Sequence, residues 1–150
     1  DTNSIQLVTP AMVERFREIE HISDYFAAKE KEVEAFNAKL PADRIKNRVN
    51  GRRLTNVGTF RAYIEGYLKS HPAINPNMTL LVRQLAPEGR GLPIEVYCFC
   101  KDKRWAHYES IQADIFDHLF AVAPEFDLRI FQEPSGIDFQ GLTQQPSSSE

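Results

Sequence analysis

The side chains with the greatest capacity for chemistry are the histidines that lie near carboxylates. Asp114 and His118 are four residues apart in the stretch "DIFDH", so on a helix they share a face, as a pair of metal ligands would. That stretch has no third convergent ligand, and the same is true of His21 and Asp24, which are three residues apart. In both places a charge pair on a helix surface is favoured over a metal site.

The two cysteines, Cys98 and Cys100, lie in the stretch "YCFC". On a strand both side chains point to the same face, and a disulfide needs converging Cβ atoms, so we predict free thiols. A structural zinc site would require a second pair of ligands, which the sequence does not offer. The sequence also has neither the nucleophile elbow of a hydrolase nor a glycine-rich phosphate loop. We therefore predict that the chain is not an enzyme and holds no cofactor or metal.

The charge balance indicates which partners to expect. The 150 residues include 18 basic and 21 acidic side chains, a net charge of -3, which argues against a nucleic-acid partner. A basic run lies between Arg44 and Arg53; a solvated connector is favoured there over an interface or a lipid-headgroup contact. The chain begins with Asp1, and we expect it to be a piece of a longer protein.

The first third of the chain predicts one long helix. The stretch "SIQLV" (4–8) alternates like a short strand, Thr9 is a helix N-cap with proline after it, and a helix of about 10–40 follows. Part of this helix shows the heptad spacing of a coiled coil, but for under three heptads, so an amphipathic helix on its own domain is favoured. The heptad positions are Ile22, Phe26, Val33 and Phe36.

The rest of the chain alternates helices and strands. A polar basic connector, 41–53, leads to a helix that we expect Asn56 to cap. The predicted elements are a helix at 56–70, strands at 78–85 and 92–100, a helix at 104–122 and a strand at 127–133. With the strand at 4–8, their order is βαββαβ. This predicts an α+β, ferredoxin-like antiparallel sheet with helices on one face and a long N-terminal helical insertion.

The second hairpin strand predicts which side of the sheet is covered. Its apolar face carries Ile94 and both cysteines and should lie under the helices, whereas Tyr97 and Phe99 point to the other side. That side is expected to be solvated or to meet a partner. Residues 1–136 are predicted to form one domain, and the polar residues 137–150 a disordered tail.

Several blocks in order resemble a known family. The stretches "LTNVGTFRAY" (54–63) and "IQADIFDHL" (111–119) are the most diagnostic. The chain resembles, from "SIQLV" to about Gly136, the cytoplasmic C-terminal α/β domain of MscS-like mechanosensitive ion channels. Within that family it is most similar to the miniconductance (YbdG-like) branch.

The resemblance implies a structural role in a homo-oligomer. In this family a membrane part opens under bilayer tension and releases solutes on hypoosmotic shock, and seven copies of the cytoplasmic part form a vestibule. The chain would then lie on the cytoplasmic side of the bacterial inner membrane, joined to it only through a missing N-terminal part. The alternative is a free-standing ferredoxin-like regulatory module that binds a small molecule or ion.

The candidate structural and contact residues follow from side-chain type and position. They are Arg52, Arg53, Asn56, Gly58, Phe60 and Arg61 around the helix start, Tyr97 and Phe99 on the sheet, and Ile22, Phe26, Val33 and Phe36 on the long helix.

Overall fold

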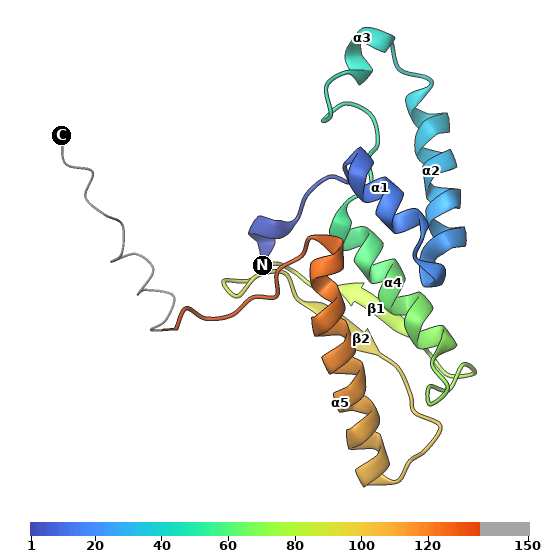
Figure 1. Ribbon diagram of the computed structural model, residues 1–150, viewed down its shortest axis with the longest axis vertical. Coiled ribbons are helices and arrows are strands. Elements are labelled where there is room, and N and C mark those ends of the chain that lie inside the picture. The colour runs from blue at the N-terminus through green and yellow to red at the C-terminus, as the bar shows by residue number, and fades with distance from the viewer. Residues whose placement is uncertain (136–150) are drawn as a thin grey trace, which may run out of the picture.

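Helices dominate the part of the chain that the structure describes, residues 1–135 of a computed structural model (Figure 1). The elements are the short 3₁₀ helices η1 (Thr2–Ser4), η2 (Glu20–Ile22) and η3 (Ala123–Phe126), the helices α1 (Pro10–Arg17), α2 (Ser23–Asn37), α3 (Ala42–Ile45), α4 (Asn56–Ser70) and α5 (Trp105–Val122), and the strands β1 (Leu81–Gln84) and β2 (Ile94–Tyr97). The predicted tail, 137–150, lies outside the described residues.

The predicted long N-terminal helix is broken into α1, η2 and α2, so the prediction of one continuous helix was wrong. The reason is visible in two phenylalanines. The rings of Phe16 and Phe26 meet edge to face at 5.9 Å. In an unbroken helix ten residues would separate their Cα atoms by about 15 Å along the axis. The break at Ile19, which has extended backbone angles, lets both rings enter one core.

The start of α1 was predicted correctly. The Thr9 hydroxyl accepts a hydrogen bond from the Met12 amide at 3.3 Å, and Pro10 occupies the first helical position. Proline is tolerated there because its missing N–H would have no partner inside the helix.

The far half of α2, α3 and the connector form an arm that projects from the rest of the molecule (Figure 1). The Asn37 side chain closes its base: its amide nitrogen donates to the Arg52 carbonyl at 2.9 Å and its oxygen accepts from the Arg52 N–H at 2.8 Å. Gly51 lies beside this pair with φ of +76°, and a Cβ there would come within 2.3 Å of the Asn37 oxygen. We call these two hydrogen bonds the Asn37 clasp.

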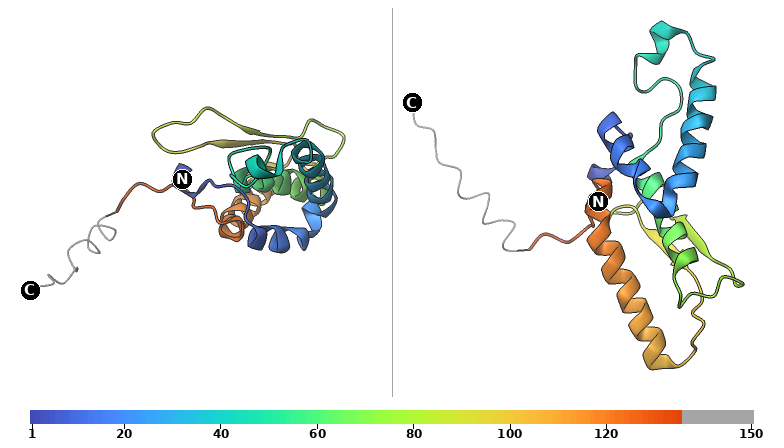
Figure 2. Two further views of the ribbon diagram at one scale, coloured as in Figure 1. Left: turned by 90° about the horizontal axis from the view of Figure 1, so that it is seen from above. Right: turned by 45° about the vertical axis from the view of Figure 1, so that its right-hand side comes forward.

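The hairpin of β1 and β2 is covered by helices on one side only (Figure 2). Its antiparallel register pairs Val82 with Val96 and Arg83 with Glu95. Ile94, Val96 and both cysteines pack against the core, as the apolar alternation predicted. The outer face of the sheet carries Tyr97, and there the Arg83 and Glu95 side chains form an ion pair.

Aromatic rings fill the core between α1, α4 and η3. Phe126 stacks on Phe16 at 5.2 Å and contacts Phe60 at 5.1 Å and Tyr63 at 5.2 Å. These rings are all buried. Aromatic pairs of this kind contribute about 0.5–1.5 kcal/mol beyond the burial of their area. The cluster therefore joins the N-terminal helices to the end of α5.

The structure is a mixed α+β fold, but the ferredoxin-like sheet does not form within residues 1–135, where the hairpin is the only sheet. The predicted strands at 4–8 and 127–133 are the missing members. The first pairs instead with the approach to α4, through an isolated bridge between Leu7 and Thr55. The second follows a left-handed turn at Asp127 (φ 54°) and runs beside η1, where the Arg129 amide donates to the Ser4 hydroxyl.

Candidate functional site

The start of α4 carries the first group of candidate residues, and it corrects one prediction. Thr55, not Asn56, is the N-cap: its hydroxyl accepts from the Gly58 N–H at 3.2 Å. A Cβ on Gly58 would lie only 2.9 Å from that hydroxyl, so glycine leaves room for the cap. Thr55 and Gly58 therefore set the helix start together, and Asn56 is free for another role.

Asn56 is a buried hydrogen-bonding hub with no exposed surface. Its side-chain oxygen accepts from the Gln6 N–H at 2.9 Å, and its amide nitrogen donates to the carbonyls of Ser4 at 2.8 Å and Phe126 at 3.1 Å. A side chain that both donates and accepts is needed here, because the partners include a backbone N–H and backbone carbonyls. Asn56 thus joins the N-terminal segment and the end of α5 to the start of α4.

The three candidate arginines lie in different surroundings. Arg52 pairs with Glu32 at 2.5 Å and its guanidinium lies 5.8 Å from the centre of the Phe36 ring. Arg53 donates to the Ile45 carbonyl at 3.2 Å, so within the arm Arg52 is tied to α2 and Arg53 to α3. Arg61 differs, because its Nε is buried without a hydrogen-bond partner among the described residues.

The four heptad positions divide between core and surface. Ile22 and Phe26 are buried in the domain's own core. Val33 is half-buried and Phe36 is 45% exposed, on the projecting part of α2. The apolar contacts at the base of the arm therefore belong to the domain itself, and only the far end of the heptad pattern offers a free surface.

The outer face of the sheet presents Tyr97 and Phe99, as predicted. Their rings meet edge to face at 5.2 Å, and Tyr97 is 48% exposed. They line an open hollow of about 620 Å³ with Met78, Lys103 and Tyr108. This face can meet an apolar or aromatic partner.

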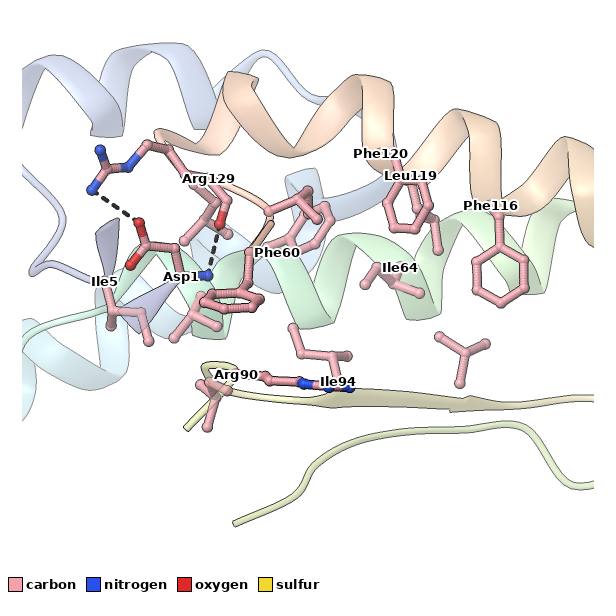
Figure 3. A pocket seen from close by; sticks show the side chains of 16 residues that line it. Asp1, Ile5, Phe60, Ile64, Arg90, Ile94, Phe116, Leu119, Phe120 and Arg129 are labelled. Atoms are coloured by element: carbon pink, nitrogen blue, oxygen red, sulfur yellow. Dashed lines mark hydrogen bonds and ion pairs between the residues drawn. The ribbon is translucent and has the colours of Figure 1, made fainter. Parts of the chain in front are cut away.

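A second apolar surface was missed at the level of sequence. Phe116 and Phe120 on α5 are 47% and 55% exposed, and their rings stack at 6.0 Å. They border a pocket of about 300 Å³ whose other walls come from α4 and β2, including Phe60 and Ile94 (Figure 3). The sequence did hold a signal for this surface: the two phenylalanines are four residues apart beside the buried stripe of α5, so they are neighbours on the helix surface.

One end of this pocket is charged. Arg129 forms an ion pair with the Asp1 carboxylate at 3.0 Å, and the Asp1 amine donates to the Arg129 carbonyl at 2.8 Å (Figure 3). Arg90 lies on the hairpin side of the pocket. The Phe116–Phe120 surface is thus an apolar strip with a polar border, the usual pattern of a protein contact.

The histidines do not form the surface charge pairs that were predicted. His118 does not pair with Asp114; its Nε2 lies 2.7 Å from the Tyr63 hydroxyl. His21 lies 3.3 Å from the Ser70 hydroxyl through its Nδ1, with no ion pair to Asp24. No group of three potential metal ligands occurs within residues 1–135.

The cysteines are free thiols, as predicted. Burial is the main cause that raises the pKa of both Cys98 and Cys100, so at neutral pH they are protonated and weakly reactive. No helix in the described part of the chain is long and apolar enough to cross a membrane.

Comparison with known sequences found one matching family and a distant relative. The family described as "Mechanosensitive ion channel MscS, C-terminal" matches residues 64–130, from the middle of α4 to just beyond η3. These residues, a little under half of the chain, are similar to the C-terminal domain of MscS channels. MscS proteins are channels and not enzymes, which confirms the prediction that the chain is not an enzyme.

A particular relative is the low conductance mechanosensitive channel YnaI of Escherichia coli (strain K12), to which the chain is distantly homologous. The two are 38% identical over 60 residues, which are 40% of this chain and 18% of YnaI. The chain thus corresponds to a small part of that relative. No solved structure matched it.

Proposed function

We propose that the chain is the vestibule domain of a tension-gated, MscS-like channel that releases solutes on hypoosmotic shock, and that its role is to assemble and not to catalyse. It acts on the cytoplasmic side of the bacterial inner membrane, as a single domain over 1–136 in a ring of copies. The family match over residues 64–130 supports the channel assignment. Seven copies and the miniconductance branch are further parts of the proposal, and they rest on the resemblance of residues 54–63 and 111–119.

The observation that carries the assembling role is the exposed apolar strip on α5. Two stacked phenylalanines, each about half exposed, form a surface that a monomer has no reason to keep. The Tyr97–Phe99 face and Phe36 on the arm are the other candidate contacts.

Oligomeric state tests this proposal. We would measure the mass of the chain by light scattering over a concentration series, for the wild type, for Phe116→Ser/Phe120→Ser, for Tyr97→Ser and for Phe36→Ser. Each variant replaces exposed aromatics, so circular dichroism should show an unchanged fold. A Tyr25→Ser variant, at an exposed tyrosine outside the candidate surfaces, is the matched control.

We expect the wild type to associate and the Phe116→Ser/Phe120→Ser variant to remain monomeric at the highest concentration. A wild type that is monomeric throughout would refute an assembling role for these residues. Loss of association in Tyr97→Ser or Phe36→Ser alone would move the interface to the sheet or the arm. Survival of cells after osmotic downshock, with the same changes in the full-length parent, tests the channel role separately.

The alternative of a small-molecule regulatory module has less support. It depended on a ferredoxin-like sheet, and within residues 1–135 the sheet has two strands. The 300 Å³ pocket beside α5 has apolar walls and is bordered by the same phenylalanines, so we assign it to the contact surface.

A further inference from the structure

Three histidines that are far apart in the sequence meet around two tyrosines of α4. His118 of α5 stacks on Tyr67 with ring centres 4.2 Å apart. His71, one residue beyond α4, meets the edge of Tyr67 at 5.5 Å, and His21 of η2 meets it at 5.9 Å. Tyr63 completes the group through its hydrogen bond to His118. We call these five residues the His–Tyr cluster.

The cluster lies where three parts of the fold come together. Gly66 marks the contact between η2 and α4: a Cβ there would lie 2.2 Å from the His21 carbonyl oxygen. Within the cluster Tyr63 is buried on α4, and Leu119, the residue after His118, is buried on α5. A change of charge in the cluster therefore acts on the packing of α5 and of the N-terminal helices against α4.

Two imidazoles of the cluster take part in hydrogen bonds. The Nδ1 atom of His71 accepts a hydrogen bond from the Ala73 backbone N–H at 3.2 Å. A backbone N–H can only donate, so a proton on this nitrogen would break the hydrogen bond in the turn that follows α4. The Tyr63 hydroxyl lies 2.7 Å from Nε2 of His118 and donates to it when His118 is neutral.

The groups that face His118 decide which charge state it prefers. Burial is the largest cause that lowers the pKa of His118, and the nearby His21 and His71 lower it further. The stacked Tyr67 ring favours a positively charged His118. Burial raises the pKa of Tyr67, and the negative charge of Asp114, one turn before His118 on α5, raises it further. Burial and the two neighbouring histidines outweigh the Tyr67 ring and the exposed Asp114 carboxylate, so the neutral form of His118 is preferred.

We propose that the His–Tyr cluster is a proton-sensitive latch, which holds α5, η2 and the turn after α4 together when His118 is neutral and loosens them in acid. An imidazole ordinarily takes up a proton near pH 6.5. Because the folded state disfavours charged His118, its stabilising effect is complete above about pH 6.5 and is lost as the pH falls below that value. The domain would then change its internal packing when its compartment acidifies.

Urea unfolding at about pH 8 and about pH 5.5 tests the latch, with the intact chain as wild type, His118→Gln, and His107→Gln as the control. His107 lies on the same helix but is exposed and pairs with Asp102. We expect the urea midpoint of the wild type and of His107→Gln to fall by the same amount on acidification, and that of His118→Gln to fall less. An equal fall in all three would overturn the proposal.

A second measurement covers the case in which His118→Gln does not fold. In the wild type, the NMR signals of the His118 ring and of the Tyr63 and Tyr67 rings should shift together with a midpoint below pH 6.5. A His118 midpoint at or above that value, or tyrosine signals that do not move, would overturn the latch.

Discussion

Substitutions of Asn56 can distinguish a helix cap from a buried hydrogen-bonding hub, two roles that asparagine can play. If it were only a helix cap, Asn56→Ala would cost about 1 kcal/mol, and Asn56→Asp would be nearly neutral because aspartate caps equally well. If it is the buried hub that the structure describes, both changes are damaging, because its partners lie 50 to 70 residues away in the sequence.

The magnitude follows from the partners that Asn56→Ala leaves behind. The Phe126 carbonyl is in a buried hydrogen bond, and losing its donor costs about 1–3 kcal/mol. The bonds to Gln6 and Ser4 are partly buried, so water can replace part of each, and about 1 kcal/mol apiece is reasonable. The sum is roughly 3–5 kcal/mol, a large share of the total stability of a small domain.

Asn56→Asp distinguishes the two roles by the direction in which the stability of the variant changes with pH. The carboxylate keeps the acceptor for Gln6 but faces the Ser4 and Phe126 carbonyls where the amide nitrogen donated. The pKa of that buried acid would rise above the usual value of about 4, since only the protonated form can donate. The variant should therefore be unstable at pH 7 and recover as the pH falls through the raised pKa.

Urea denaturation followed by circular dichroism is the suitable assay, because the single tryptophan, Trp105, is 78% exposed and reports poorly on unfolding. Thr55→Ala, at the true cap, is the neighbouring control and should lose about 1 kcal/mol. Equal losses in Thr55→Ala and Asn56→Ala, together with a stable Asn56→Asp, would refute the hub.

Two other changes test the packing of the N-terminal helices. Gly66→Ala should destabilise the chain even though alanine favours a helix by about 1 kcal/mol, because the added carbon lies against the His21 carbonyl; a higher urea midpoint would contradict that contact. Phe26→Ala should cost about 3–5 kcal/mol, and Phe36→Ala less than about 1 kcal/mol, since the first ring is buried and the second is exposed on the arm. Similar losses would mean that the whole of α2 packs on the domain.

The sequence pattern predicted those helices whose signals lie within their own residues. The helix at 56–70 and the helix at 104–122 were found within one residue, because their apolar spacing and end signals lie inside the element itself. The hairpin was found for the same reason, although its strands are shorter than predicted.

Distant contacts explain what the sequence did not reveal. The break near Ile19 occurs at a stretch without proline or glycine, and only the meeting of Phe16 with Phe26 accounts for it. The segment at 4–8 bonds to the approach to α4, a partner that its own alternation cannot specify. In the same way, the residues of the His–Tyr cluster come from three separate segments with no shared motif.

The Asn37 clasp makes the tip of the arm a suitable place for insertions. Because one side chain fixes the two ends, at Asn37 and Arg52, the residues at the tip can change in length with little effect on the core, provided that Arg48 keeps its hydrogen bond to the Leu7 carbonyl. Each doubling of such a loop adds only about 0.6 kcal/mol of closure entropy. An affinity tag or a rigid marker for electron microscopy could be inserted there, at a position that projects clear of the helices around the hairpin (Figure 1).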